Sequence, residues 1–279
     1  MFYIPCDKAN TRDYFKEWNG YSLLVAAVSV GNVGQLAADL IVSTLEMTSV
    51  GYIYDESILP VVGNNPYSAV SHSSCSLVTG CEVYECPEKQ LVLILQRAPF
   101  VRGKRAGFRK RLVQWIKAHT FNQVIILTSS FSHERLDSQL MGSQFRFLTS
   151  LSLESTVGDL FRNKFKWKQL EKRPCFPAPS GLESGSNDQT GTIYIPGGGI
   201  AKTLFTDCCN SDLNVIVLLL FCAEGDNAWH AQYLATRLNQ WLSLIPVSPN
   251  ADLQATGNWT IPPSWRLTFG SAFDPTLYH

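Results

Sequence analysis

The sequence predicts an α/β protein built around one largely parallel or mixed sheet, and two observations lead to this prediction. Residues 21–30 form an almost continuous run of apolar and small residues without a charge, which is typical of a strand buried on both faces. Gly31 and Gly34 end that run, and apolar residues then recur at helical spacing over residues 36–45. A strand, a glycine turn and a helix in this order open an α/β unit.

The alternation of strands and helices continues along the chain. Further strands are expected at residues 50–55, 81–86, 91–95, 124–127, 145–148, 192–196 and 213–221, and the segment 264–270 is also strand-like. Helices are expected at about 106–118, 153–172, 200–205 and 228–244, with Trp229 among the inward-facing residues of the last one. The strands at 91–95 and 124–127 and the helix between them predict a βαβ unit with a right-handed crossover.

Residues 174–191 are rich in Pro, Ser and Gly, which predicts a flexible loop. Because strands and helices alternate on both sides of it, we expect a single α/β domain over residues 1–279. The loop is then an excursion at about 174–191, and an extended C-terminal tail follows at about 271–279.

The composition excludes several classes of protein. The chain has 279 residues, a formal net charge of zero and 45% hydrophobic residues, so no global field directs it to nucleic acid or membrane. The N-terminus lacks a signal-peptide pattern, and no apolar run reaches about 18 residues. Its eight cysteines have irregular spacing, which indicates reduced thiols. We expect a soluble protein of the cytoplasm, also present in the nucleus, that binds neither nucleic acid nor membrane.

The charges are unevenly distributed, with nine Lys or Arg and no Asp or Glu between Lys89 and His133. Such a stretch is usually a solvated loop and helix face. A run of like charges this dense also suggests contact with an acidic partner surface. The candidate residues for that contact are Arg97, Arg102, Lys104, Arg105 and Arg109.

Two glycine turns suggest phosphate binding, and neither has the required spacing. Residues 31–34 supply a G-x-x-G where a dinucleotide fingerprint needs G-x-G-x-x-G, although Asp55 ends the next strand where a ribose ligand would sit. Residues 197–203 lack the four-residue spacer of a P-loop, and Ala201 precedes Lys202 where the motif has glycine. A turn that opens a helix explains both segments better.

The remaining reactive side chains do not predict a catalytic or metal site. Ser129, Ser130, His133, Glu134 and Asp137 contain the residue types of a hydrolase, but residues so close in sequence rarely converge, and a polar loop explains them better. A zinc site from His72, Cys75, Cys81 and Cys86 is disfavoured, because Cys81 and Cys86 should face opposite sides of one strand. No catalytic residue, metal or cofactor is therefore predicted. The alternative is a phosphorylase- or hydrolase-like enzyme that acts on a small anionic substrate.

Five segments in order between Ser22 and Gly270 resemble a known family, the proteasome assembly chaperone 2 (PAC2) family. These segments are AVSVGNVGQLAADLIVSTL, VVGNNPY, IPGGGIAKTLF, LLLFCAEGDN and IPPSWRLTFG. The resemblance implies a non-catalytic three-layer α/β/α sandwich related to nucleoside phosphorylases. It also implies a chaperone that heterodimerises with proteasome assembly chaperone 1 and binds the alpha ring of the 20S core particle. Such a chaperone promotes ring assembly and prevents off-pathway alpha-ring dimerisation.

The last three residues, Leu277, Tyr278 and His279, fit the hydrophobic-tyrosine-any pattern by which this family docks on the alpha ring. The resemblance implies that Leu277 packs on a pocket wall and that the Tyr278 ring lies between adjacent alpha subunits. The terminal carboxylate of His279 then meets a lysine of the pocket. The alternative for such a segment is a frayed terminus.

Overall fold

An eight-stranded mixed sheet forms the centre of the molecule in a computed structural model, which describes residues 1–6, 18–68, 76–174, 191–246 and 258–267. The strand order is β1 (Phe2–Pro5), β3 (Thr48–Tyr54), β6 (Cys81–Cys86), β7 (Leu91–Gln96), β2 (Ser22–Ala26), β8 (Gln123–Phe131), β12 (Val215–Cys222) and β9 (Phe145–Thr149). The four strands from β7 to β12 in this order are parallel, whereas β1, β3, β6 and β9 pair antiparallel at the two sides. The prediction of a mixed α/β sheet is therefore confirmed.

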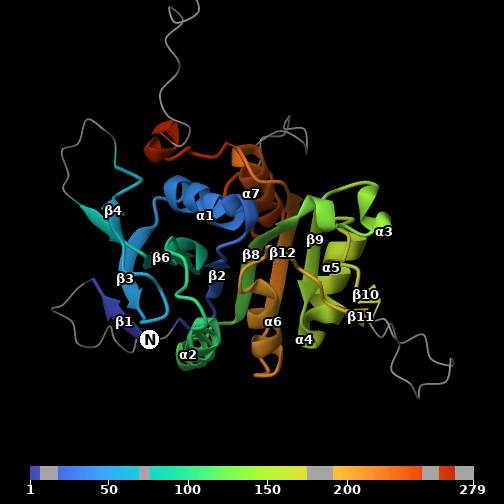
Figure 1. Cartoon of the computed structure of the whole chain (residues 1–279), viewed down its shortest axis with the longest axis horizontal. Helices are drawn as coiled ribbons and strands as arrows, with labels where there is room; N and C mark the ends of the chain where they lie inside the picture. The colour runs from blue at the N-terminus through green and yellow to red at the C-terminus, as the bar shows by residue number, and fades with distance from the viewer. Residues whose placement is uncertain (7–17, 69–75, 175–190, 247–257, 268–279) are drawn as a thin grey trace, which may run out of the picture.

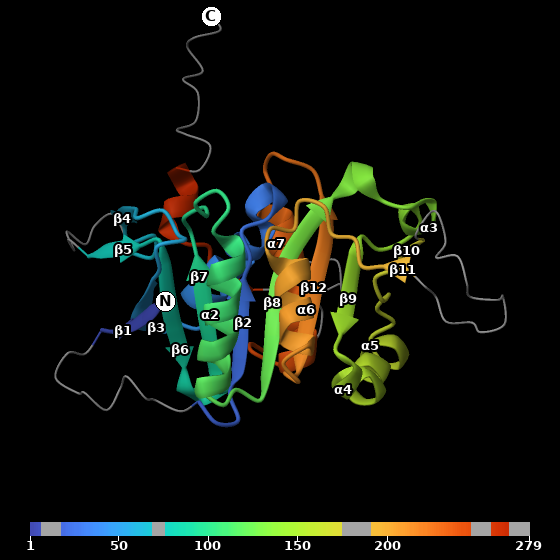
Figure 2. The same ribbon diagram turned by 60° about the horizontal axis from the view of Figure 1, so that its bottom comes forward.

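Helices cover both faces of this sheet, as Figure 1 shows. One face carries α1 (Val33–Thr44) and α7 (Ala228–Leu242), and the other carries α2 (Arg105–Ala118) and α6 (Ala201–Cys209), which lie in front of the strands in Figure 2. Alternate residues of the central strands enter two separate cores. On β2, Leu23 and Val25 face α2 and α6, whereas Leu24 and Ala26 face α1 and α7. The expected three-layer α/β/α sandwich is confirmed.

Two smaller pairs of strands lie outside the main sheet. The hairpin of β4 (Val62–Asn64) and β5 (Leu77–Thr79) projects beyond β3, and β10 (Arg173–Pro174) pairs with β11 (Gly191–Thr192). A short helix, α3 (Asp137–Leu140), follows β8, and α4 (Leu151–Leu153), a π-helical segment (Glu154–Gly158) and α5 (Asp159–Asn163) follow β9. The last described element is the 3-10 helix η6 (Pro263–Leu267).

Three elements differ from the sequence-based expectation, and local chemistry explains each difference. The helix expected to residue 172 ends at Asn163, because the chain turns at Lys166 (φ 55°) and residues 168–170 then hydrogen-bond to Phe147 of β9. The strand expected at 192–196 is limited to β11 and gives way to the turn before Gly197. The strand-like segment 264–270 is helical at its start, where Pro263 fixes φ.

Parts of the predicted domain organisation lie outside the described residues. These are most of the loop at about 174–191 and the whole tail at about 271–279. Strands from both sides of that loop, β9 before it and β12 after it, pair with each other in the one main sheet. Within the described part of the chain, no helix has the length and apolar character needed to cross a membrane.

Candidate functional site

The carboxyl ends of the central parallel strands are where ligands bind in open α/β sheets. At this edge the turn from β2 to α1 meets the turn that precedes α6. The Val30 N–H donates to the Gly197 carbonyl at 2.8 Å, and the Ser129 hydroxyl of β8 donates to the Val30 carbonyl at 2.5 Å. The hydroxyl oxygens of Ser29 and Ser129 lie 2.7 Å apart. Two turns that are far apart in sequence are therefore joined by buried hydrogen bonds.

Other segments of the chain pack directly against these glycine turns. A Cβ atom on Gly31 would lie 2.3 Å from Nδ2 of Asn227, and a Cβ on Gly199 would lie 2.0 Å from the Val28 carbonyl oxygen. Both glycines also have positive φ angles, of 62° and 61°, which favour glycine. The close approach of chain segments therefore explains these glycines, and the Asn227 side chain occupies the place where a phosphate would approach Gly31.

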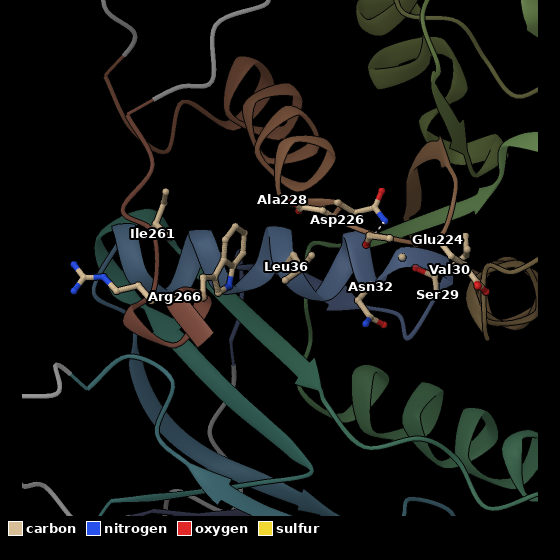
Figure 3. A pocket seen from close by; sticks show the side chains of 13 residues that line it. Ser29, Val30, Asn32, Leu36, Glu224, Asp226, Ala228, Ile261 and Arg266 are labelled. Carbon is tan, nitrogen blue, oxygen red and sulfur yellow. Dashed lines mark hydrogen bonds between the residues drawn. The ribbon is translucent and has the colours of Figure 1, made fainter. Parts of the chain in front are cut away.

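A cleft of about 730 Å³ lies beside this contact, between α1, the loop from β12 to α7 and η6 (Figure 3). Leu36, Ile261 and Trp265 supply apolar side chains to its wall, whereas Glu224 and Asp226 supply carboxylates near the start of α1. Asp226 also accepts the Ala228 N–H at 2.9 Å and so caps α7. Glu224 and Asp226 would repel a small anionic substrate near the start of α1, whereas Arg266 lines the cleft at its η6 end.

The hydrolase-like residues do not converge on this cleft. Ser129 and Ser130 belong to β8 and are fully buried, so the expectation that the polar loop starts at residue 129 is wrong. The strand continues because Ser130 donates to the Pro196 carbonyl at 2.9 Å, just as Ser129 donates to Val30. The centroids of the His133 and Phe131 rings instead lie 5.0 Å apart, and the Tyr194 hydroxyl donates a hydrogen bond of 3.1 Å to the Glu134 carboxylate.

Neither Asp55 nor the cysteines form the sites considered from sequence. Asp55 binds the Arg111 guanidinium of α2 through two hydrogen bonds of 2.8 and 2.7 Å, away from the Gly31 turn. Burial opposes ionisation of Asp55, but the bond from Arg111 and those from Ser57 outweigh it and hold its pKa well below the usual range. Cys81 and Cys86 enter the two opposite cores, as predicted.

Burial raises the pKa of the Cys81 thiol and raises that of Cys208 to about 12, so neither is a thiolate at neutral pH. Among the described residues no cluster of three or more His, Cys, Asp or Glu could hold a metal ion, and His72 and Cys75 lie outside them. The described residues therefore give no support to the hypothesis of a zinc site.

The structure divides the five predicted basic residues into two groups. Arg97 points inward to Asp39 at 2.6 Å, and Arg109 binds Asp207 at 2.8 Å. Lys104 pairs with Glu56 at 3.2 Å, with both side chains exposed. Arg102 and Arg105 are exposed and have no ion pair among the described residues. The acidic partners come from distant segments, so the sequence of the stretch itself could not reveal them.

The structure also shows an apolar surface that sequence reasoning missed. Of the large hydrophobic residues exposed among the described residues, six line adjoining depressions at the β4–β5 end of the molecule: Tyr54, Leu59, Val61, Val62, Leu77 and Ile261. We call these six residues the apolar surface. The only local signal for it is the presence of Leu59, Val61 and Val62 in a turn-rich loop, where polar residues are usual.

The predicted docking residues Leu277, Tyr278 and His279 lie outside the described residues. Their role stays a prediction. The last described residue, Leu267, ends η6, and Ser264 of that helix donates its N–H to the Pro66 carbonyl next to β4 at 3.2 Å. The chain therefore leaves the described body beside the apolar surface.

Comparison with known proteins identifies the family. A sequence model of the PAC2 family matches residues 23–224. Proteasome assembly chaperone 2 of Homo sapiens is 40% identical over 280 residues, which cover 99% of this chain and 100% of that protein. The protein of the same name from Danio rerio is 40% identical over 266 residues, covering 95% of this chain and 98% of its own.

Solved structures agree on the fold. Pyrococcus furiosus PbaA, described as an archaeal homolog of proteasome-assembly chaperone, superposes with a TM-score of 0.60 at 16% identity, covering 85% of this chain and 87% of its own. Pyrococcus furiosus PbaB, described as an archaeal proteasome activator, superposes with a TM-score of 0.56 at 14% identity, covering 82% of this chain and 86% of its own. At these identities the likeness concerns the fold alone. The family model and the near-complete coverage at 40% identity show more: the chain belongs to the PAC2 family.

Proposed function

We propose that this chain is a proteasome assembly chaperone. The observation that carries the proposal is its 40% identity, over 99% of its length, to a protein named proteasome assembly chaperone 2. The site geometry is consistent with a binding function. The two glycine turns contact other parts of the chain, Ser129 and Ser130 are buried, and carboxylates line the cleft near the start of α1. These features argue against the phosphorylase- or hydrolase-like alternative.

In finer detail, the proposed chaperone heterodimerises with proteasome assembly chaperone 1 and binds the alpha ring of the 20S core particle in the cytoplasm and nucleus. It promotes correct ring assembly, prevents off-pathway dimerisation of alpha rings, and uses no cofactor. The family membership supports the chaperone activity and the two partners, which the family resemblance implied. The location and the absence of a cofactor are expectations that the composition and the motifs gave.

Affinity purification from cells tests the proposal directly. The tagged full-length chain should recover proteasome alpha subunits together with a second chaperone of the same family. Recovery of neither would contradict the proposed function. The enzyme alternative is tested on the same purified material: turnover of a nucleoside, nucleotide or ester that Lys202→Ala abolishes would establish a catalytic activity at the turn before α6.

The tail residues Leu277, Tyr278 and His279 are proposed to dock on the alpha ring. A free terminal carboxylate can form a charge-assisted hydrogen bond, and an added residue would move that carboxylate away. Deletion of the three residues, or one residue added after His279, should weaken alpha-ring binding while the heterodimer persists. Tyr278→Ala should cost about 1–3 kcal/mol of binding free energy. Wild-type affinity after the deletion, measured by titration with purified alpha rings, would exclude the tail.

A further inference from the structure

The β4–β5 end of the molecule carries a continuous, hollowed and apolar surface. Val61 and Val62 line two adjoining depressions, of about 200 and 230 Å³, and Val78 joins the second of these to a larger one of about 570 Å³. Ile261 lines that larger depression and also the cleft beside α1. The shared lining residues therefore connect Tyr54, at one end of the apolar surface, to η6 at the other.

This concentration of exposed apolar side chains is unusual for a free surface. Val62 is 66% exposed and Leu77 is 64% exposed, on neighbouring strands of the hairpin. Phe2, another exposed residue, pairs with Tyr54 across β1 and β3 and extends the surface at its edge. Contiguous exposed apolar patches of this kind mark interaction sites on soluble proteins.

The charges next to Leu59 are basic in excess, whereas Glu46 and Glu82 line the depression at the Leu77 end of the apolar surface. Arg102 lies in the loop before α2, and Arg105 is the first residue of that helix. This loop is fixed next to Leu59, since the Leu59 N–H donates to the Pro99 carbonyl at 3.1 Å and the Val101 N–H donates to the Ser57 carbonyl at 2.8 Å. Glu56 lies next to Ser57 in the neighbouring loop, and its carboxylate already forms an ion pair with Lys104. Arg102 and Arg105 remain exposed, so the Leu59 end of the surface suits a partner with apolar side chains flanked by carboxylates.

The place where the described chain ends indicates which partner this is. Ser264 of η6 donates to Pro66, two residues after β4, and Pro263 of η6 lines the same depression as Leu77, so the described chain ends beside the apolar surface. A partner that holds the end of the C-terminal tail lies within reach of the same side of the body.

We infer that the apolar surface, with Arg102 and Arg105 beside it, is a second contact to the alpha ring, on an alpha-subunit surface that presents apolar side chains and carboxylates. This inference rests on the proposed function. Nine residues, 268–276, separate the last three residues from η6, so a second contact on the body of the chain would restrict how the two proteins are oriented. The body contact fixes the orientation and adds to the affinity of the tail by raising its effective concentration.

The test is a double variant, Val62→Glu with Leu77→Glu, in the full-length chain purified together with its partner chaperone. Both side chains are exposed, so folding should be retained, and buried carboxylates would oppose the contact. Binding to purified proteasome alpha rings should weaken by about tenfold or more, in the intact chain and again after deletion of residues 277–279. The matched control is Met141→Glu with Leu151→Glu, two exposed residues just after α3 and in α4. These elements lie beside β9, at the opposite end of the sheet, and the control should bind as the wild type.

Three results would overturn the inference. One is equal alpha-ring affinity of the double variant and the control. Another is loss of the partner chaperone from the double variant, which would assign the apolar surface to the heterodimer. The third is a wild-type chain that self-associates through this surface, seen as a smaller particle for the variant in size-exclusion chromatography. If the wild type itself fails to bind alpha rings, the proposed function is wrong, which is a different outcome from loss of binding in the variant alone.

Discussion

The carboxyl edge of the central strands and the apolar surface differ in how completely the chain covers them. At the central edge, Val30 donates a hydrogen bond to Gly197 and accepts one from Ser129. The Asn227 side chain packs directly against Gly31. At the β4–β5 end, Val62 and Leu77 face solvent although they are apolar. The glycine turns at the edge where ligands bind in related architectures are therefore used here for internal packing, and the cleft beside them carries Glu224 and Asp226. Exposed apolar side chains gather instead at one side of the sheet.

The largest effect is expected at the central edge. A Cβ on Gly34 would lie 2.5 Å from the Leu127 carbonyl oxygen, a backbone atom of β8 that cannot move away without disturbing the sheet. Gly34→Ala should therefore lower the free energy of unfolding by about 3 kcal/mol or more, measured by denaturant unfolding. Gly63→Ala is the matched control in β4, where nothing lies within 4 Å, and its effect should stay within about 0.5 kcal/mol. Equal stabilities would refute the close-packing explanation of Gly34.

The two regions also differ in how far their structure could be predicted from the sequence. The central strands and the turn at Gly31 were predictable because the length of each apolar run and the positions of the glycines are local signals in the sequence. The continuation of β8 through Ser129 was not, since its hydroxyl is satisfied by Val30, which is distant in sequence. Helical spacing placed Trp229 of α7 inward, and that prediction is wrong, because Trp229 is 53% exposed near the first turn of the helix.

The candidate functional residues show more clearly what could not be predicted from the sequence. The basic stretch was correctly recognised as dense in charge, but Arg97 and Arg109 bind Asp39 and Asp207, which fold next to it from other elements. The apolar surface combines residues from Tyr54 to Ile261, so no window of sequence contains it. Sequence patterns describe what one segment can do, whereas a surface depends on which segments become neighbours.

An intermediate effect is expected for the ion pair beneath the apolar surface. Asp55 is buried and Arg111 holds it, so Arg111→Ala would leave a buried carboxylate with fewer partners. The cost should be about 3 kcal/mol, at the lower end of the usual range because the Arg111 side chain is 32% exposed. Chemical denaturation at pH 7 measures this loss. No change would show that Asp55 is adequately stabilised without Arg111.

The pH dependence of stability tests the same pair. The pKa of Asp55 is lower in the folded chain than in the unfolded one, so the unfolded state takes up a proton first as the pH falls. The stabilisation is therefore fully present above the ordinary carboxyl pKa of about 4 and is lost progressively below it. Thermal melts between pH 7 and pH 3 should show a shallower acid loss for Arg111→Ala than for the wild type. Parallel curves would mean that Arg111 does not lower this pKa.

The smallest effect is expected for the free cations beside the apolar surface, and it should appear in kinetics rather than in stability. Arg102 and Arg105 are exposed, so their reversal to Glu removes no ion pair of the described structure. Reversal should change the free energy of unfolding by less than about 0.5 kcal/mol. It should slow association with alpha rings most strongly at low salt, because charges at the rim of an interface act chiefly on the encounter rate.

The control for this pair keeps the same change in net charge. Lys110→Glu with Lys117→Glu reverses two exposed cations of α2. If the basic residues act by position, only the Arg102 and Arg105 variant should lose most of its salt dependence of association, as followed by stopped-flow mixing with alpha rings. If both double variants slow association equally, the effect reflects net charge alone. The loop beside Leu59 would then have no specific role, and the apolar residues would have to supply the body contact without electrostatic guidance.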